Sequence, residues 1–292
     1  MRYENVIVIG YGVIAGHVIE TVYQYQSKYD FKLIYLEHEV HPFNSAARFA
    51  QNHCISDERI EDKKALHDYF SKLESPTLII SSNNNYLFPS DVVKRDNISI
   101  INFHNALLPN YPGRNAPTWA IYNGEKETGI TWHYVNEGID EGDIIVQKTC
   151  PISDNAKAYE LTSKLMEIGG EAFDECIESV LNDNVVTRKQ CYTPGRRLYR
   201  SKEIPGDGKI DFNAPVKDIY KLLRALDYGK YEIFPLPYAD WKGERIQICR
   251  YKVVPKTEII HEGKENVILL GMDDSHELCL TFKVVDIIVK NI

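Results

Sequence analysis

One stretch in the middle of the sequence constrains the fold more than any other. The apolar run at 98–101 predicts a buried strand, and Asn102 and His104 follow at its end. Because successive side chains of a strand alternate between two faces, this amide and this imidazole leave the same face. A second strand is predicted at 128–135, and Asp140 lies in the loop after it. Polar side chains on loops at strand ends mark the ligand side of an open α/β sheet.

Apolar periodicity and the Gly and Pro breakers predict the remaining elements. Further buried strands are expected at 5–9, 33–36 and 77–81, and a hairpin strand at 143–148. Helices are expected at 46–52, 62–73, 117–121, 158–181 and 216–226, with another after Gly12. Short alternating strands are expected at 245–254, 267–270 and 278–284.

These elements predict an α/β fold in two parts. The first is a Rossmann-like catalytic domain with a mostly parallel sheet over residues 1–190. A connector follows at 191–204, and a small β-rich C-terminal domain occupies 205–292.

Composition and charge narrow the possible functions. The net charge is −8 and the pI is near 5.6, which argues against a large nucleic-acid surface. The six cysteines have no C-x-x-C spacing, so they indicate reduced thiols rather than a disulfide framework, and no histidine pair has metal-ligand spacing. No apolar run approaches the roughly 20 residues of a membrane span, and the N-terminal sequence lacks a signal-peptide layout. We therefore expect a cytoplasmic protein without a metal, a membrane or a nucleic acid as partner.

The middle stretch resembles the folate-dependent formyltransferases, which include methionyl-tRNA, glycinamide ribonucleotide and sugar-nucleotide N-formyltransferases. The matching residues form an ordered series: Asn102-Phe103-His104, Leu107-Leu108-Pro109, Tyr111-Pro112-Gly113-Arg114, Ala116-Pro117, Trp119-Ala120, Gly124-Glu125, Thr128-Gly129, His133, Asp140 and Gly142-Asp143. The pattern covers about a sixth of the chain tightly, and weaker similarity extends over most of it. Within the family the chain looks most like the sugar-nucleotide enzymes that act on dTDP-4-amino-4,6-dideoxyglucose.

The resemblance implies that Asn102, His104 and Asp140 are the catalytic trio and that N10-formyltetrahydrofolate donates the formyl group. Asn102 would donate a hydrogen bond to the oxyanion that forms. His104 would accept the amine proton or, if protonated, stabilise the oxyanion. Asp140 would raise the proton affinity of the imidazole or relay a proton through water. Each residue alone could be structural, and His133 fits a structural role as well as a functional one.

The resemblance also implies two binding sites. The folate site would include Tyr86, Leu87, Phe88, Leu108 and Asp140, although the Asn-rich segment before Tyr86 could be a plain polar loop. The site for a nucleotide-linked aminosugar would use side chains from the first turn, the loop after the catalytic strand, the connector and the C-terminal part. Its candidates are Gly10, Tyr11, Gly12, Arg114, Arg196, Arg197, Arg224, Tyr228 and Tyr231. The arginines suit a diphosphate, but a basic run can equally be solvated surface.

Three functions remain open from the sequence. The first is formylation of the amine of a dTDP-linked 4-amino-4,6-dideoxy sugar for lipopolysaccharide O-antigen synthesis, by a homodimer as the resemblance implies. The second is methionyl-tRNA formyltransferase. The third is an NAD-dependent oxidoreductase or a nucleotide-binding module, because Gly10-x-Gly12-x-x-Ala15 fits a relaxed dinucleotide fingerprint, with Glu37 on the ribose.

Overall fold

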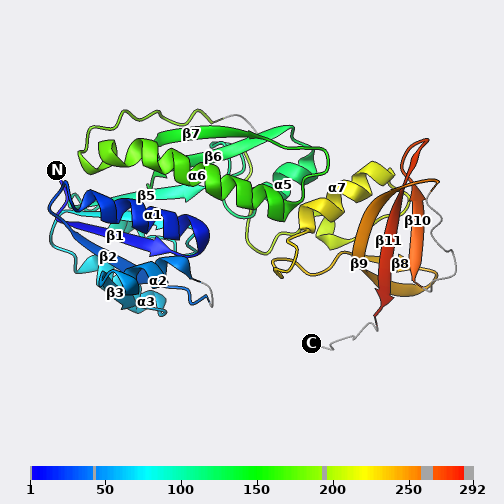
Figure 1. Cartoon of the computed structure of the whole chain (residues 1–292), viewed down its shortest axis with the longest axis horizontal. Helices are drawn as coiled ribbons and strands as arrows, with labels where there is room; N and C mark the ends of the chain where they lie inside the picture. Colours follow the sequence, from blue (N-terminus) through cyan, green and yellow to red (C-terminus); the bar gives the residue numbers. More distant parts are fainter. Residues whose placement is uncertain (1, 42–43, 193–195, 258–265, 286–292) are drawn as a thin grey trace. The chain divides into compact units, whose positions relative to one another are not determined.

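Figure 1 shows the computed structural model of the chain, which describes residues 2–41, 44–192, 196–257 and 266–285. Its contacts divide the chain into two compact units. The first unit comprises Met1–Ala116, Glu127–Pro151 and Thr162–Tyr199. The second comprises Pro117–Lys126, Ile152–Leu161 and Arg200–Ile292.

The first unit is built on a seven-stranded sheet in the order β3-β2-β1-β4-β5-β6-β7. Its strands are β1 Asn5–Gly10, β2 Lys32–Glu37, β3 Ser56–Arg59, β4 Thr77–Ser82, β5 Ile98–His104, β6 Glu127–Tyr134 and β7 Ile144–Pro151. Strands β3, β2, β1, β4 and β5 pair in parallel, whereas β6 and β7 pair antiparallel. The central strands are almost wholly buried, as expected for a parallel sheet covered on both faces.

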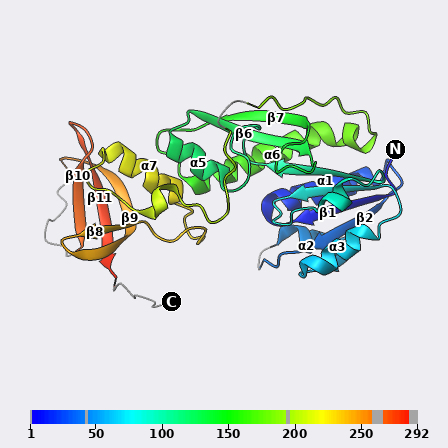
Figure 2. The same cartoon turned by 180° about the vertical axis from the view of Figure 1, so that it is seen from behind.

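Helices cover both faces of this sheet (Figures 1 and 2). The helices are α1 Gly12–Tyr25, α2 Ser45–Asn52, α3 Lys63–Ser71, α4 Ser90–Val93 and α6 Ala158–Leu181. Helix α1 lies beside α6, where His17 and Thr21 both contact Asp174 at 2.9 Å. Leu66 and Phe70 of α3 pack against alternate residues of β1, β2 and β4 in one apolar cluster. Because successive side chains of each strand point to opposite faces of the sheet, the strands contribute to two separate cores.

Helix α6 approaches the sheet closely at Gly169. A Cβ there would lie 2.3 Å from the ring of Phe103, so no larger residue fits without a shift. The Gly169 carbonyl also accepts a 2.9 Å hydrogen bond from the Trp132 indole on β6. This contact fixes α6 over β5 and β6, the two strands that carry the candidate site.

The second unit contains a four-stranded antiparallel sheet in the order β10-β11-β9-β8. Its elements are α5 Ala116–Asn123 at the unit boundary, the 3-10 turn Pro205–Gly208, α7 Val216–Leu226, β8 Tyr238–Trp241, β9 Glu244–Pro255, β10 Val267–Gly271 and β11 His276–Val284. The apolar stripe of α7, including Ile219, Leu222 and Leu223, packs against the sheet residues Ile246 and Leu278. Burial of such a stripe is the main reason that an isolated amphipathic helix becomes stable.

The predicted fold class is confirmed: a mostly parallel Rossmann-like sheet with helices, followed by a small antiparallel C-terminal sheet. Strands β3 and β8 and the four-residue helix α4 were not predicted from the sequence. The domain bounds at 190 and 205 stay a prediction, and they cover residues 193–195, 258–265 and 286–292, which lie outside the described residues. In the described ranges, no helix is long and apolar enough to cross a membrane.

Candidate active site

The structure brings the predicted catalytic trio together through a fourth residue, His133. Asn102 and His104 lie at the end of β5, and Asn102 pairs in register with His133 on β6. The Asn102 Nδ2 atom is 3.2 Å from His133 Nε2, which is 3.5 Å from Asp140 Oδ1. The other carboxylate oxygen of Asp140 is 3.5 Å from His104 Nδ1. The four side chains form one continuous polar chain, and His104 and His133 are almost fully buried.

The tautomer of neutral His104 follows from its partner. Its Nε2 is 2.8 Å from the carbonyl oxygen of Tyr111, which can only accept, so Nε2 carries the proton. The lone pair then lies on Nδ1, which faces Asp140. A proton captured by this ring therefore arrives at Nδ1 and is stabilised by the carboxylate.

Burial sets the charge state of His104. It lowers the pKa of the imidazole below the usual value, and the favourable effects of Asp140 and the Tyr111 carbonyl do not fully compensate. His133, when it carries a second proton, and Arg114 lower the pKa of His104 further because they add positive charge nearby. Burial thus favours the unprotonated imidazole, which is the form that can act as a base.

Asp140 is held as an anion in a buried position. Burial alone would raise the pKa of its carboxyl, but the two imidazoles and the backbone N–H of Gly113 outweigh burial, and the pKa lies well below its usual range. The Gly113 N–H donates to Asp140 Oδ2 at 2.7 Å. Asp140 has φ 53°, in the left-handed region that Asp tolerates better than most residues. Such backbone strain is common where a side chain must be aimed.

The Asn102 amide is oriented by Ser81 on β4. The Ser81 hydroxyl donates to Asn102 Oδ1 at 2.8 Å, so the Nδ2 hydrogens are the ones that face His133. The neutral His133 ring donates from Nδ1 to the Tyr134 carbonyl at 2.7 Å and can accept from Asn102 at Nε2. An amide fixed this way is a preorganised donor for an oxyanion.

The predicted folate residues lie at different depths. Tyr86 and Phe88 pack in the core cluster of the first unit, with ring centroids 5.3 Å apart. The side chain of Leu87, between Tyr86 and Phe88, is 69% exposed, so it is the most accessible of these three residues to a ligand. Leu108 is buried, and its N–H donates to the Thr131 hydroxyl at 3.1 Å.

Arg114 lies near Tyr11 of the first turn and near His104. The carbonyls of Gly10, Tyr11 and Gly12 accept from Tyr35, Asn83 and Ser45, respectively. The positive charge of Arg114 acts on both Tyr11 and His104.

The other predicted substrate residues belong to two different units of the chain. The Arg196 guanidinium bonds to Glu141 and to loop carbonyls, and Arg197 lies over the Tyr199 ring at 5.0 Å. Arg224 belongs to the second unit, where it is buried and donates to the Ala156 carbonyl at 2.8 Å. In the same unit, Tyr228 bonds to Thr118 at 2.9 Å, and Tyr231 is 52% exposed.

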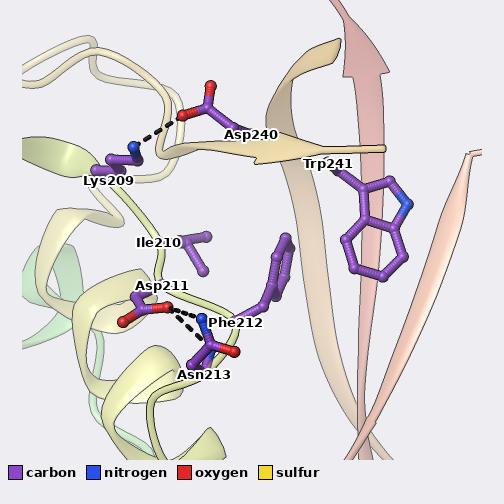
Figure 3. A pocket seen from close by; sticks show the side chains of 7 residues that line it. All are labelled: Lys209, Ile210, Asp211, Phe212, Asn213, Asp240 and Trp241. Atoms are coloured by element: carbon purple, nitrogen blue, oxygen red, sulfur yellow. Dashed lines mark hydrogen bonds and ion pairs between the residues drawn. The ribbon is translucent and has the colours of Figure 1, made fainter. Parts of the chain in front are cut away.

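A separate hollow of about 520 Å³ lies in the second unit (Figure 3). Its charged side chains are engaged with neighbours: Lys209 pairs with Asp240 at 2.8 Å, and Asp211 accepts from Asn213. Phe212 and Trp241 form its apolar wall, with ring centroids 5.0 Å apart. We assign no chemistry to this hollow. No cluster of three or more metal-ligating side chains occurs in the described part of the chain.

Sequence reasoning missed several residues of the site. Ser81 orients Asn102, and Gln190 and Tyr192 bond to the loop that carries Asp140. His133 matched the family pattern, but only the strand register shows that it lies opposite Asn102. Ser81 lies near the end of the buried strand β4 and pairs in register with Asn102 on β5, a position that could have pointed to it.

Comparison with known proteins identifies the family. Residues 11–177 match the model described as formyl transferase, which is more than half of the chain. The chain belongs to the formyl transferase family. This enzyme class agrees with the resemblance found in the sequence, and it disfavours the NAD-dependent alternative. The roles of Asn102, His104 and Asp140 stay a prediction.

Relatives of this formyl transferase differ in their acceptors. The methionyl-tRNA formyltransferase of Clostridium tetani is 29% identical over 224 residues, covering 77% of this chain and 70% of the relative. Among three such bacterial relatives, the match spans 59–70% of the relative's length.

Solved structures share the fold of this formyl transferase. WlaRD, a sugar 3N-formyl transferase crystallised with dTDP and 5-N-formyl-THF, aligns with a TM-score of 0.72 and 20% identity, covering 97% of this chain and 98% of WlaRD. A 4-N formyltransferase from Francisella tularensis aligns with a TM-score of 0.65 and 21% identity, covering 84% and 96% of the two chains.

We expect His104→Ala and Asn102→Ala each to lower kcat by about 100-fold or more while the protein stays folded. One change removes the base and the other removes the oxyanion donor. Steady-state rates with circular dichroism as the folding control check this. A variant with near-wild-type turnover contradicts its assigned role.

The pH dependence of Asp140→Asn tests the Asp140–His104 contact. His104 must be neutral to act as a base, so activity falls as the pH drops through its pKa, which burial lowers from its usual value. The substitution removes the anion that raises this pKa. The acidic limb of the kcat/KM profile should therefore move to lower pH, and the plateau should fall. An unchanged profile at an unchanged rate would reduce Asp140 to a turn residue.

Proposed function

We propose that this protein transfers a formyl group from N10-formyltetrahydrofolate to the amine of a dTDP-linked 4-amino-4,6-dideoxy sugar, with dTDP-4-amino-4,6-dideoxyglucose favoured. The observation that carries the proposal is the continuous chain from Asn102 through His133 and Asp140 to His104. It places a donor for an oxyanion and a base for an amine on one sheet edge of a formyl transferase fold.

The residues suit attack of a neutral amine on a formyl carbon. As the carbon–nitrogen bond forms, negative charge develops on the formyl oxygen and positive charge on the amine nitrogen. Asn102 donates to the oxygen through the Nδ2 group that Ser81 orients. His104 takes the amine proton on Nδ1, where Asp140 stabilises the imidazolium. The intermediate then collapses: the bond between the formyl carbon and the folate nitrogen breaks, and the proton held on His104 passes to that nitrogen. The products are the formamide and tetrahydrofolate, and His104 is again a neutral base.

Folate as the donor is supported by the family and by WlaRD, which was crystallised with a formyl-folate. Exposed Leu87 offers apolar surface beside the carboxyl end of β4, where open α/β sheets bind ligands. Leu108 and Asp140 would face the same ligand from the loops after β5 and β6.

A nucleotide-linked sugar as the acceptor is supported by three observations. The protein is acidic, with a net charge of −8. Its fold aligns along nearly the whole of WlaRD, including the C-terminal part. Arg114 carries a positive charge near both the first turn and His104. We extend the proposal to a cytoplasmic homodimer that serves O-antigen synthesis.

The second candidate, methionyl-tRNA formyltransferase, is favoured by the sequence relatives. It predicts a binding surface rich in Lys and Arg and an affinity that falls steeply with salt. The acidic composition does not favour such a surface.

An acceptor screen decides between the candidates. The purified protein is given N10-formyltetrahydrofolate with dTDP-4-amino-4,6-dideoxyglucose, with a 3-amino counterpart, or with methionyl initiator tRNA, and products are detected by mass spectrometry. We expect the 4-amino sugar to be formylated with the highest kcat/KM and His104→Ala to abolish the product. A preference for the 3-amino sugar would change the amine position that we assign to the acceptor. Formylation of the tRNA alone would overturn the proposal.

Arg114→Lys tests the placement of the diphosphate. Lysine keeps the charge but loses the fork that binds two oxygens at once. We expect the KM for the nucleotide-sugar to rise roughly tenfold, the worth of one hydrogen bond to a charged group. The KM for the folate should change little. Arg48→Lys, at an exposed position on α2, is the matched control. A raised folate KM with the sugar KM unchanged means that the two pockets are assigned the wrong way round.

A further inference from the structure

The backbone of the loop that carries Asp140 is bonded to side chains far along the chain. Four consecutive carbonyls, from Ile139 to Gly142, accept hydrogen bonds from Gln190, Tyr192 and Arg196. Gln190 Nε2 donates to the carbonyls of Asp140 and Gly142 at 2.9 and 2.8 Å. The Tyr192 hydroxyl donates to the Glu141 carbonyl at 3.0 Å, and Arg196 Nη2 donates to the Ile139 carbonyl at 3.2 Å.

Arg196 also joins this loop to the loop after His104. Its Nη1 pairs with the Glu141 carboxylate at 2.6 Å, and its Nε donates to the Pro109 carbonyl at 3.3 Å. The guanidinium lies 4.8 Å from the centre of the Tyr192 ring, and the side chain is only 17% exposed. A planar fork with several donors is suited to such a bridging position.

The geometry of Asp140 explains why the loop needs these contacts. Its left-handed backbone takes the loop out of regular secondary structure, so the loop carbonyls need partners elsewhere. The same backbone aims the carboxylate at Gly113, His104 and His133. The position of this loop therefore sets all three contacts.

We propose that Gln190, Tyr192 and Arg196 form a clamp that positions Asp140 against His104 during formyl transfer. This inference rests on the function proposed above. These are positioning residues, because they act through the loop backbone and not on the reacting atoms. The contacts also occupy the Arg196 guanidinium, so this arginine holds the loop and does not bind the diphosphate.

Loosening the clamp should change the pKa of His104, which can be measured. The groups that face His104 are Asp140, the Tyr111 carbonyl, His133 and Arg114. The first two raise the pKa of His104, whereas the other two lower it. If Asp140 moves away, the main anionic partner is lost and the pKa of His104 falls.

The test uses Arg196→Lys in the full-length protein, with Arg59→Lys as the matched control. Arg59 forms an exposed pair with Glu61 at 2.8 Å in the same unit, away from the site residues. The His104 ring is titrated by NMR without substrate, its signal assigned through its loss in His104→Ala. We expect Arg196→Lys to lower the pKa of His104 and to reduce kcat up to about 100-fold, with both KM values nearly unchanged. Tyr192→Phe, which removes one hydroxyl and keeps the ring, should produce a smaller shift in the same direction.

The titration separates this inference from the proposed function because it needs no activity. If no acceptor is formylated but Arg196→Lys still shifts His104, the clamp stands and the proposed function fails. An unshifted His104 overturns the clamp, as does a rise in the KM for the nucleotide-sugar alone. In the double variant Asp140→Asn, Arg196→Lys, His104 should have the same pKa as in Asp140→Asn alone. The reason is that both changes weaken the same contact, the one between Asp140 and His104. Fully additive shifts also overturn the clamp.

Discussion

The Asp140 carboxylate is the buried charge on which the arrangement of the site depends. It accepts from the Gly113 N–H and faces His104 with one oxygen and His133 with the other. A buried anion is costly unless it is hydrogen-bonded or paired, so the Gly113 N–H must stay in place. Protonation of either imidazole then adds an ion pair to the same carboxylate. The loops after β5 and β6 meet at this one side chain. The sheet positions Asn102, His104 and His133, and the Asp140 carboxylate holds these polar side chains in one arrangement.

The fold could be predicted where the sequence carries strong apolar patterns. The runs at 5–9, 77–81 and 98–101 became β1, β4 and β5, and the stripe at 216–226 became α7. Strand β3 escaped because its residues, Ser-Asp-Glu-Arg, have no apolar side chain, and it lies at the sheet edge where only β2 fixes it. Strand β8 is also a short edge strand. Both missed strands have only four residues, so each gives too short a window for hydrophobic periodicity.

The site was predictable only in part, and for a similar physical reason. Asn102 and His104 share a strand face, and Asp140 follows in family order, so local spacing was enough to select them. The role of His133 needed the register of β5 against β6. Gln190 lies 50 residues from Asp140 in the sequence and contacts its carbonyl. Polar residues of an irregular connector carry no periodicity, and only tertiary structure shows where their hydrogen bonds go.

The account depends on which nitrogen of His104 carries the proton. Nitrogen-15 NMR of the imidazoles at neutral pH measures this directly in the ligand-free protein, with the His104 signals assigned through His104→Ala. The structure predicts the Nε2–H tautomer, because Nε2 faces the Tyr111 carbonyl, with the unprotonated Nδ1 directed at Asp140. A neutral ring protonated on Nδ1, or a ring that stays doubly protonated at neutral pH, would contradict the account.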